Sequence, residues 1–571
     1  MLKGDFTENM GRVFIIYTGG CLSAAAVLVL MSVLGVSDHL IGIGFVALTV
    51  VFYALMGLLA RTRHAGEYYE AGRRVPALYT GMATAADWMS AASFIGMAGA
   101  IYAAGYDGLA FVLGWTGGYI LVAVLLAPYL RKFGQFTVPD FLAARYGGKP
   151  ARLMGIVVLV SASFAYVVGQ IYGTGIICAR FLDIPFEMAV FVGLGGILLC
   201  SMLGGMRALI WTQVAQYVVV IAAYLLPMVL LSTRETGIPV PQIMYGEAMQ
   251  RVAGLQAQLG LAPDALGISD RVNFFGLVLC LMLGTASLPH VLSRFFNTPS
   301  VREARTSVAW SLLFICLLYV TAPAYAAFAK LEVFQHVIAT GLSSGPDWLE
   351  AWSRIGLMSL KDGVFTIDPD AVVLAAPEIA GLPFVVAGLV AAGALAASMS
   401  SADGLLLSIG NALSHDVYYR ILKPTAETRH RLILGRVIMV LAALAAAWVA
   451  SQRPAGILTV VGWAFSLAAS GLFAALVLGI WWKRATKTGA VLGMASGWAV
   501  CLFYIVATQK LGMPPWFGVK NIAAGLFGLP VSLVVTVLAS LFTKPPSQEM
   551  QDFIDSIRIP RGQVKMAPKA E

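Results

Sequence analysis

Residues 381–413 read GLPFVVAGLVAAGALAASMSSADGLLLSIGNAL, an apolar stretch with a single charged residue, Asp403. A helix of about 20 apolar residues crosses the hydrocarbon core of a bilayer, so this stretch is long enough to span one. Similar runs fill most of the 571-residue chain, which is 59% hydrophobic and 12% charged, with a mean hydropathy of +0.82. A soluble protein of this size carries more charge. The sequence therefore predicts an all-α polytopic membrane protein.

About 14 transmembrane helices are expected, because the apolar runs are too long for strands and lack an alternating pattern. We interpret residues 12–35 as a retained helix, with a cleaved signal peptide as the alternative. The expected spans are about 12–35, 39–60, 78–104, 108–130, 153–179, 186–206, 208–232, 272–293, 307–329, 381–413, 432–451, 455–482, 488–508 and 521–542.

The distribution of lysine and arginine predicts the orientation, because basic residues are enriched in cytoplasmic loops. With the N-terminus inside, about 28 of the 38 basic residues fall on the cytoplasmic side. Both termini are then cytoplasmic, as expected for a bacterial inner-membrane protein, and the net charge of +9 needs no nucleic-acid partner. The longest external loops are expected at 233–271 and 330–380, and the polar tail from Thr543 is expected to be mobile. The main cytoplasmic segments are Arg61 to Arg74, Arg131 to Arg152, Arg294 to Arg305, Arg420 to Arg436, Lys483 to Lys487 and Lys544 to Lys569.

The sequence shows no enzyme signature. There is no HExxH, no nucleotide-binding loop and no Ser–His–Asp set in one layer of the membrane. The six cysteines all lie in apolar runs without a CxxC pair, and such cysteines behave as small buried hydrophobes. We therefore expect no catalytic residues and no cysteine-bound metal.

Two acidic residues lie deep within the expected spans, Asp87 in the third and Asp403 in the tenth. A charged side chain at membrane depth is costly, so each is a candidate functional residue. The structural alternative is that each acid is protonated or paired and takes no part in function.

Small and hydroxyl-bearing residues surround both acids. Ala397, Ser400 and Ser401 are spaced i, i+3 and i+4 and share one helix face, and Ala86 and Met89 are three residues apart. If the helix unwinds near Met89, backbone carbonyls become free to join the two hydroxyls. About five oxygens would suit a hard cation such as sodium, near the midplane where transporters bind ions. Close helix packing through small residues is the alternative.

Seven ordered motifs resemble the sodium:solute symporter family along almost the whole chain, and most closely its cation/acetate symporters. The motifs are Glu67-Tyr68-Tyr69-Glu70-Ala71-Gly72-Arg73, Met89-Ser90-Ala91-Ala92-Ser93-Phe94-Ile95-Gly96, Gly105-Tyr106-Asp107-Gly108, Gly204-Gly205-Met206, Gly284-Thr285-Ala286-Ser287-Leu288-Pro289-His290 with Arg294-Phe295-Phe296, Arg302-Glu303-Ala304-Arg305, and Ser414-His415-Asp416-Val417-Tyr418.

The resemblance implies a sodium-coupled symporter fold, an inverted five-plus-five helix repeat with two broken helices. The transport core would occupy residues 78–482. Two peripheral helices and a basic loop (1–77) would precede it, and two peripheral helices (483–542) and a cytoplasmic tail (543–571) would follow. The family's sodium site maps to Ala86, Met89, Ala397, Ser400 and Ser401.

One departure from the family concerns a second cation. Many members have Trp-Thr-Asp where this chain has Trp211-Thr212-Gln213, so the acid at that position is absent. Asp403 stands on the helix where those relatives place hydroxyl ligands for the second ion. Asp403, Gln213 and Asp87 are therefore candidates for a second-cation or proton site.

Candidate solute-binding residues are Ser90, Ser93, Gln170, Thr285 and Ser287, with helix packing as the alternative for each. The broken helix would offer backbone amides near Ser90 to Ser93, which suits a small carboxylate. His290 is a candidate gate or proton group, with a structural histidine as the alternative.

The expected function is secondary active uptake of a short monocarboxylate such as acetate by alternating access. Sodium is the expected coupling ion, with the proton as the alternative, and no other cofactor is expected. Other solutes, such as a proline-like amino acid or another organic acid, remain alternatives, as do a membrane sensor and a channel.

Overall fold

The computed structural model describes residues 10–60, 75–133, 137–202, 206–261, 267–296, 300–340, 347–361 and 364–559. The predicted basic loop Arg61 to Arg74, the Gly204-Gly205 pair and the tail beyond residue 559 lie outside these ranges. Within them the protein is almost entirely helical. Eleven helices are long and apolar enough to cross a membrane, or twelve if the bent pair Arg271–Thr285 and Pro289–Phe295 counts as one. The prediction of an all-α polytopic membrane protein is thus confirmed.

The first half of the chain contains the elements from α1 to α12. They are α1 (Met10–Val33), α2 (Asp38–Leu59), α4 (Ala77–Trp88), η2 (Ala92–Gly96), α5 (Met97–Ala104), η3 (Gly105–Gly108), α6 (Leu109–Leu121), η4 (Val122–Leu126), α7 (Ala127–Phe133), α8 (Val138–Tyr146), α9 (Gly148–Leu182), α10 (Phe186–Ser201), α11 (Met206–Thr236) and α12 (Pro241–Gln258).

The second half begins with another broken helix. Its elements are α13 (Arg271–Thr285), α14 (Pro289–Phe296), α15 (Val301–Tyr319), α16 (Ala322–Thr340), α17 (Asp347–Arg354), β1 (Met358–Lys361), β2 (Val364–Ile367), η5 (Pro369–Ala371), α18 (Val372–Ile379), α19 (Phe384–Asn411), η6 (Ala412–Leu422), α20 (Thr428–Ser451), α21 (Ile457–Ala468), η7 (Ala469–Phe473), α22 (Ala474–Trp481), α23 (Lys487–Lys510), η8 (Trp516–Gly518), η9 (Asn521–Ala523), α24 (Gly525–Phe542) and α25 (Gln548–Arg558).

The two broken helices occupy equivalent places in the chain. The first break separates α4 from η2 at Met89 and Ser90, and the second separates α13 from α14 with a bend of 45°. Each break opens a set of five successive spans. Because five is odd, the second set starts on the opposite side of the membrane from the first, which makes the repeat inverted. Both breaks lie in apolar surroundings, where freed backbone groups are tolerated only inside the protein or along a cavity.

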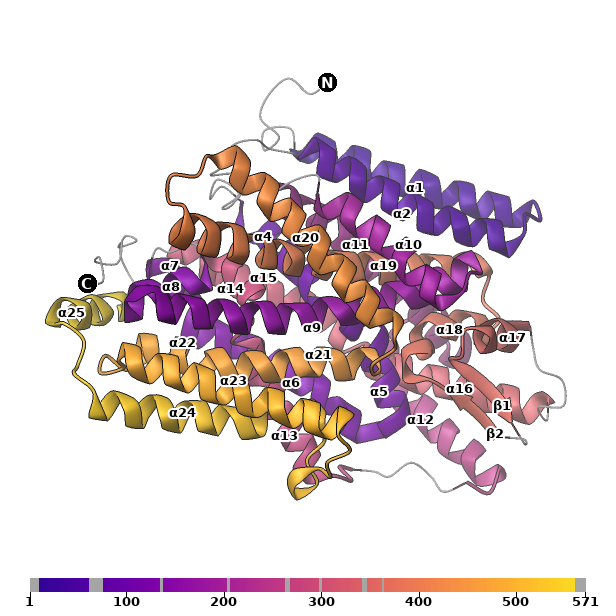
Figure 1. Cartoon of the computed structure of the whole chain (residues 1–571). Coiled ribbons are helices and arrows are strands. Elements are labelled where there is room, and N and C mark those ends of the chain that lie inside the picture. The colour runs from indigo at the N-terminus through magenta and orange to yellow at the C-terminus, as the bar shows by residue number, and fades with distance from the viewer. Residues whose placement is uncertain are drawn as a thin grey trace.

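The helices are arranged around two long central ones (Figure 1). α9 and α19 pack against each other, and the layers to either side are α1 with α2 and α23 with α24. At one end of the bundle lie α12, α17 and the β1–β2 hairpin, and at the opposite end lie α7, α8 and α25. The core therefore consists of long helices that run between two ends of different construction.

The structure differs from three expectations about local structure. The span predicted at 307–329 lies within a longer helical stretch, α15 followed by α16, that runs from 301 to 340. The predicted external loops instead contain α12 and an antiparallel hairpin in which Met358 pairs with Ile367. The tail predicted to be mobile forms α25, which buries Met550, Ile554 and Ile557. Polar composition hid this helix because only one of its faces is apolar.

Candidate ion and solute site

The predicted ion site lies where α19 meets the end of α4. At Met89 the backbone leaves helical geometry (φ −74°, ψ 65°), so the last carbonyls of α4 are not all used within the helix. The Ser400 hydroxyl lies 2.6 Å from the carbonyl oxygen of Ala86, and the Ser401 hydroxyl lies 2.5 Å from that of Asp87. The Ser400 hydroxyl is also 2.9 Å from the Ala397 carbonyl of its own helix. Hydroxyl and carbonyl oxygens from two helices therefore meet at one point.

The oxygens at this point fit the needs of a hard cation. Of the five predicted residues, the structure brings Ala86, Ala397 and Ser400 into direct contact, and Met89 stands at the break itself. Ser401 instead contacts the carbonyl of Asp87, a group that the sequence did not predict. All of these residues are buried. Neutral oxygens of this kind can surround sodium without leaving a net charge in the protein.

Asp87 forms a buried ion pair that the sequence did not reveal. Arg294 of α14 places Nη2 2.9 Å from the Asp87 carboxylate, and the two side chains are only 3% and 1% exposed. Gln213 of α11 donates to Asp87 Oδ1 at 3.1 Å and to the Ser400 carbonyl at 2.8 Å, and it accepts from Arg294 at 2.7 Å. Arg294, predicted to start a cytoplasmic segment, is thus inside the protein. A buried carboxylate needs a charged or hydrogen-bonding partner, so the position of Asp87 within a span was the signal in the sequence that such a partner exists.

Asp403 belongs to a different contact. Its carboxylate accepts a short hydrogen bond from Ser201 at the end of α10. The three candidates for a second cation or proton, Asp87, Gln213 and Asp403, therefore do not share one hydrogen-bonded cluster. Two of them are joined around Arg294, and the third faces another helix.

Several buried polar atoms at the two breaks make no hydrogen bond within the described part of the chain. They include Ser90 Oγ, Gln170 Nε2 and Thr285 Oγ1. Gln170 accepts a hydrogen bond from the backbone nitrogen of Ala91 at 2.9 Å, which directs its amide oxygen to the break and leaves its NH₂ group as a donor. The Ala91 amide, predicted to be free for a carboxylate, is thereby occupied. Unpaired buried donors are costly, so these atoms mark a place that suits a polar solute.

The other predicted solute and gate residues have protein partners or lie apart. The Ser93 hydroxyl is 3.1 Å from the Tyr319 hydroxyl and 3.2 Å from the Trp88 carbonyl. Ser287 donates to Leu283 in its own helix at 2.7 Å, as a packing residue does. The His290 ring lies against Tyr166 with centroids 5.7 Å apart, and its Nδ1 has no hydrogen bond among the described residues.

An aromatic wall completes the region, and the sequence did not predict it. The Phe465 ring of α21 lies 5.6–6.0 Å from the rings of Trp88, Trp115 and Tyr166, which come from α4, α6 and α9. A Cβ at Gly284, beside Thr285, would come within 2.5 Å of the Phe465 carbonyl, so only glycine allows this approach. Aromatic residues are frequent in membrane helices, so their convergence had no signal in the sequence.

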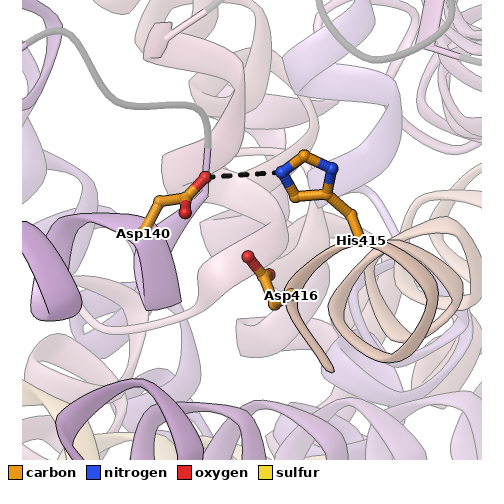
Figure 2. A group of neighbouring side chains, drawn as sticks. All are labelled: Asp140, His415 and Asp416. Atoms are coloured by element: carbon orange, nitrogen blue, oxygen red, sulfur yellow. Dashed lines mark ion pairs between the residues drawn. The ribbon is translucent and has the colours of Figure 1, made fainter. Parts of the chain in front are cut away.

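A second polar cluster lies at the end of the bundle that holds α8. Figure 2 shows the Asp140 carboxylate pointing toward the His415 ring, 3.8 Å away, with Asp416 beside them. One possible ligand atom from each lies within 4.8 Å of the others. Arg152, however, contacts Asp140 at 2.7 Å and Asp416 at 3.0 Å.

The protonation of His415 also disfavours a metal at this cluster. Arg431 lies 2.8 Å from His415 Nδ1 and can only donate, which leaves the ring proton on Nε2, the nitrogen that faces Asp140. The cluster is therefore an ion-pair network that joins α8, α9, η6 and α20.

Comparisons with known proteins agree with this architecture. The model of the sodium:solute symporter family matches residues 68–349 and 364–497. An uncharacterized symporter of Cupriavidus necator is 42% identical, over 88% of this chain and 91% of its own. A monocarboxylic acid transporter of Corynebacterium glutamicum is 27% identical, over 90% of this chain and 94% of its own.

A solved structure shares the fold. It is a Na⁺-coupled sialic acid symporter in a substrate-bound, outward-open state, and it superposes with a TM-score of 0.68 at 18% identity, covering 89% of this chain and 99% of that one. The family model covers most of the chain, including both broken helices and the serine pair of α19. This chain is therefore a multi-pass transporter that belongs to the sodium:solute symporter family.

Proposed function

We propose that this protein is a sodium-coupled importer of a short monocarboxylate, with acetate the leading candidate, in a bacterial inner membrane. Both termini face the cytoplasm in this proposal. The observation that carries it is the contact of the Ser400 and Ser401 hydroxyls with the carbonyls of the broken helix α4. The relative in Corynebacterium that is named as a monocarboxylic acid transporter supports the solute class.

Sodium would act by holding two helices together. The ion would be coordinated by oxygens of α4 and α19. Without the ion, these oxygens are joined by the hydrogen bonds from Ser400 and Ser401 to the α4 carbonyls. Binding from outside favours the conformation in which the broken helix is ordered and the solute binds. The bundle then rocks and releases both to the inside, as in transporters with a binding site near the midplane.

Arg294 bears on the coupling stoichiometry. The guanidinium neutralises Asp87 inside the protein, so this carboxylate offers no unbalanced charge to a second cation. One sodium and one monocarboxylate are together neutral and draw only on the sodium gradient. A second cation would add about 2.3 kcal/mol per 100 mV of membrane potential.

The solute region suits a small anion held by neutral donors. Ser90, Gln170 and Thr285 present unpaired polar atoms. The Phe465 ring packs against the rings of Trp88, Trp115 and Tyr166. The nearest arginine in the network already binds Asp87 and Gln213. We therefore favour a short acid over a sugar, which needs long polar side chains for its hydroxyls.

Uptake of radiolabelled acetate into proteoliposomes tests the proposal. We expect saturable uptake that depends on an inward sodium gradient and is inhibited by propionate and pyruvate. The same uptake driven by a proton gradient without sodium would assign the proton as the coupling ion. Uptake of proline or a neutral sugar that acetate, propionate and pyruvate do not inhibit would refute the solute class.

A further inference from the structure

A groove lies on the membrane-facing side of α20, next to the end of α10. Its volume is about 330 Å³, and it is lined by Met202, Ile433, Arg436, Val437, Val440 and Leu441. Among the described residues, the lining is apolar except for the single arginine. Ile433, Val437 and Leu441 remain well exposed, as expected of side chains that meet lipid.

The short length of α10 explains the groove. This helix has 16 residues and is about 24 Å long, less than the roughly 30 Å of the hydrocarbon core. It ends at Ser201, whose hydroxyl is bonded to Asp403 within the bundle. Among the described residues, α10 does not cover the face of α20 beyond Met202, where Val437 and Leu441 stay well exposed.

Arg436 lies in this groove without a partner. Among the described residues it forms no hydrogen bond and no ion pair, in contrast to Arg152, Arg180 and Arg294, which all contact carboxylates. It stands eight residues into α20, about 12 Å from the start of the helix at Thr428. An unpaired arginine at this depth is costly unless an anion reaches it or its side chain extends to the interface.

We propose that the groove binds an anionic phospholipid of the cytoplasmic leaflet, with one acyl chain along Val437, Val440 and Leu441 and its phosphate on Arg436. The guanidinium presents paired donors that match phosphate oxygens. The apolar lining matches an acyl chain and offers nothing to a soluble anion. The predicted orientation starts α20 on the cytoplasmic side, among Arg420, Lys423 and Arg429, where anionic headgroups are attracted.

The test is lipid binding to the purified full-length protein, which is independent of transport. Wild type in detergent is titrated with phosphatidylglycerol and, separately, with phosphatidylcholine, and bound lipid is counted by native mass spectrometry. Wild type should bind one phosphatidylglycerol more tightly than the rest. Arg436→Gln should weaken that site about fivefold or more, since one lipid-facing arginine contributes about that factor. Arg354→Gln, which changes an exposed arginine of α17 that is not part of the groove, is the control and should leave that site unchanged.

Two further variants separate charge from shape. Val440→Trp keeps the arginine and fills the groove, so it should also abolish the tight site, whereas Arg436→Lys should keep most of it. Equal binding of phosphatidylcholine and phosphatidylglycerol would overturn the proposal, and so would an Arg436→Gln protein that binds like wild type. Concentration-dependent self-association that Val440→Trp prevents would assign the groove to a second copy of the chain instead.

Discussion

Replacing Arg294 by glutamine should strongly destabilise the protein. The guanidinium makes contacts of 2.9 and 3.2 Å with Asp87 and 2.7 Å with Gln213, and all three residues are buried. Without it, Asp87 keeps only its hydrogen bond from Gln213 and its charge is unpaired in a medium of low dielectric. Breaking a buried pair by removing one partner costs about 3–5 kcal/mol.

Removing both charges should cost less than removing one. The double variant Asp87→Asn/Arg294→Gln leaves no isolated charge, and neutral amides can keep hydrogen bonds to Gln213. The assay is thermal unfolding of the detergent-purified variants, followed by tryptophan fluorescence and by retention on size exclusion. We expect Arg294→Gln to unfold at the lowest temperature and the double variant to unfold close to wild type.

The exposed pair Arg354–Asp183 supplies the matched control. Its side chains are 56% and 62% exposed, and exposed pairs contribute about 0–1 kcal/mol, so Arg354→Gln should change stability little. If Arg294→Gln and Arg354→Gln unfold at the same temperature, or the double variant is no better than Arg294→Gln, the buried-pair reasoning is refuted.

Three further predictions concern the ion site and the external segments. Ser401→Ala should raise the sodium concentration needed for half-maximal uptake, while Ser398→Ala, which removes a hydroxyl bonded only to its own helix, should not; equal sodium dependence in both would show that the site is misplaced. Asp403→Asn should fold normally and alter the reversal potential of transport at varied sodium and proton gradients, and an identical reversal potential would make Asp403 structural. Asp370 lies outside the spans, and burial, followed by the charge of Asp368, raises its pKa to about 7, so the native state holds a proton that the unfolded chain releases above about pH 4. Stability should therefore fall as pH rises toward 7, and the unfolding temperature of Asp370→Asn relative to wild type should be higher at pH 8 than at pH 5.5; a gap that does not change with pH would contradict the assignment.

The sequence carried the strongest information about the membrane helices. Every predicted span falls on a helical segment, because a run of about 20 apolar residues has few alternatives in a bilayer. The sequence predicted the ends of the helices less well where the chain leaves the membrane. The pair α15 and α16 extends well beyond 307–329, and α25 appeared where a mobile tail was expected, because amphipathic helices lack a continuous apolar run.

The candidate ion site could be predicted from the sequence because the residues within each of its two segments lie close together in the chain. Ala397, Ser400 and Ser401 share a helix face by their spacing alone, and the Met89–Ser90 break lies close to the small residues 83–86. Contacts between side chains of different helices cannot be predicted from residue spacing in this way. The position of Asp87 within a span indicated that it needs a partner, but the sequence did not identify that partner as Arg294, or the partner of Asp403 as Ser201.

The sequence by itself determined that this chain is a bundle of membrane helices with hydroxyl groups beside a helix break, because hydrophobic length and helical periodicity are local properties. Only the tertiary structure decided which buried charges are paired, which buried polar atoms make no hydrogen bond among the described residues, and which arginine lines the groove on α20. Those outcomes depend on contacts between residues hundreds of positions apart, such as Asp87 with Arg294 and Ser400 with Ala86. In a medium of low dielectric, the partner of a charge rather than the charge itself determines its chemistry.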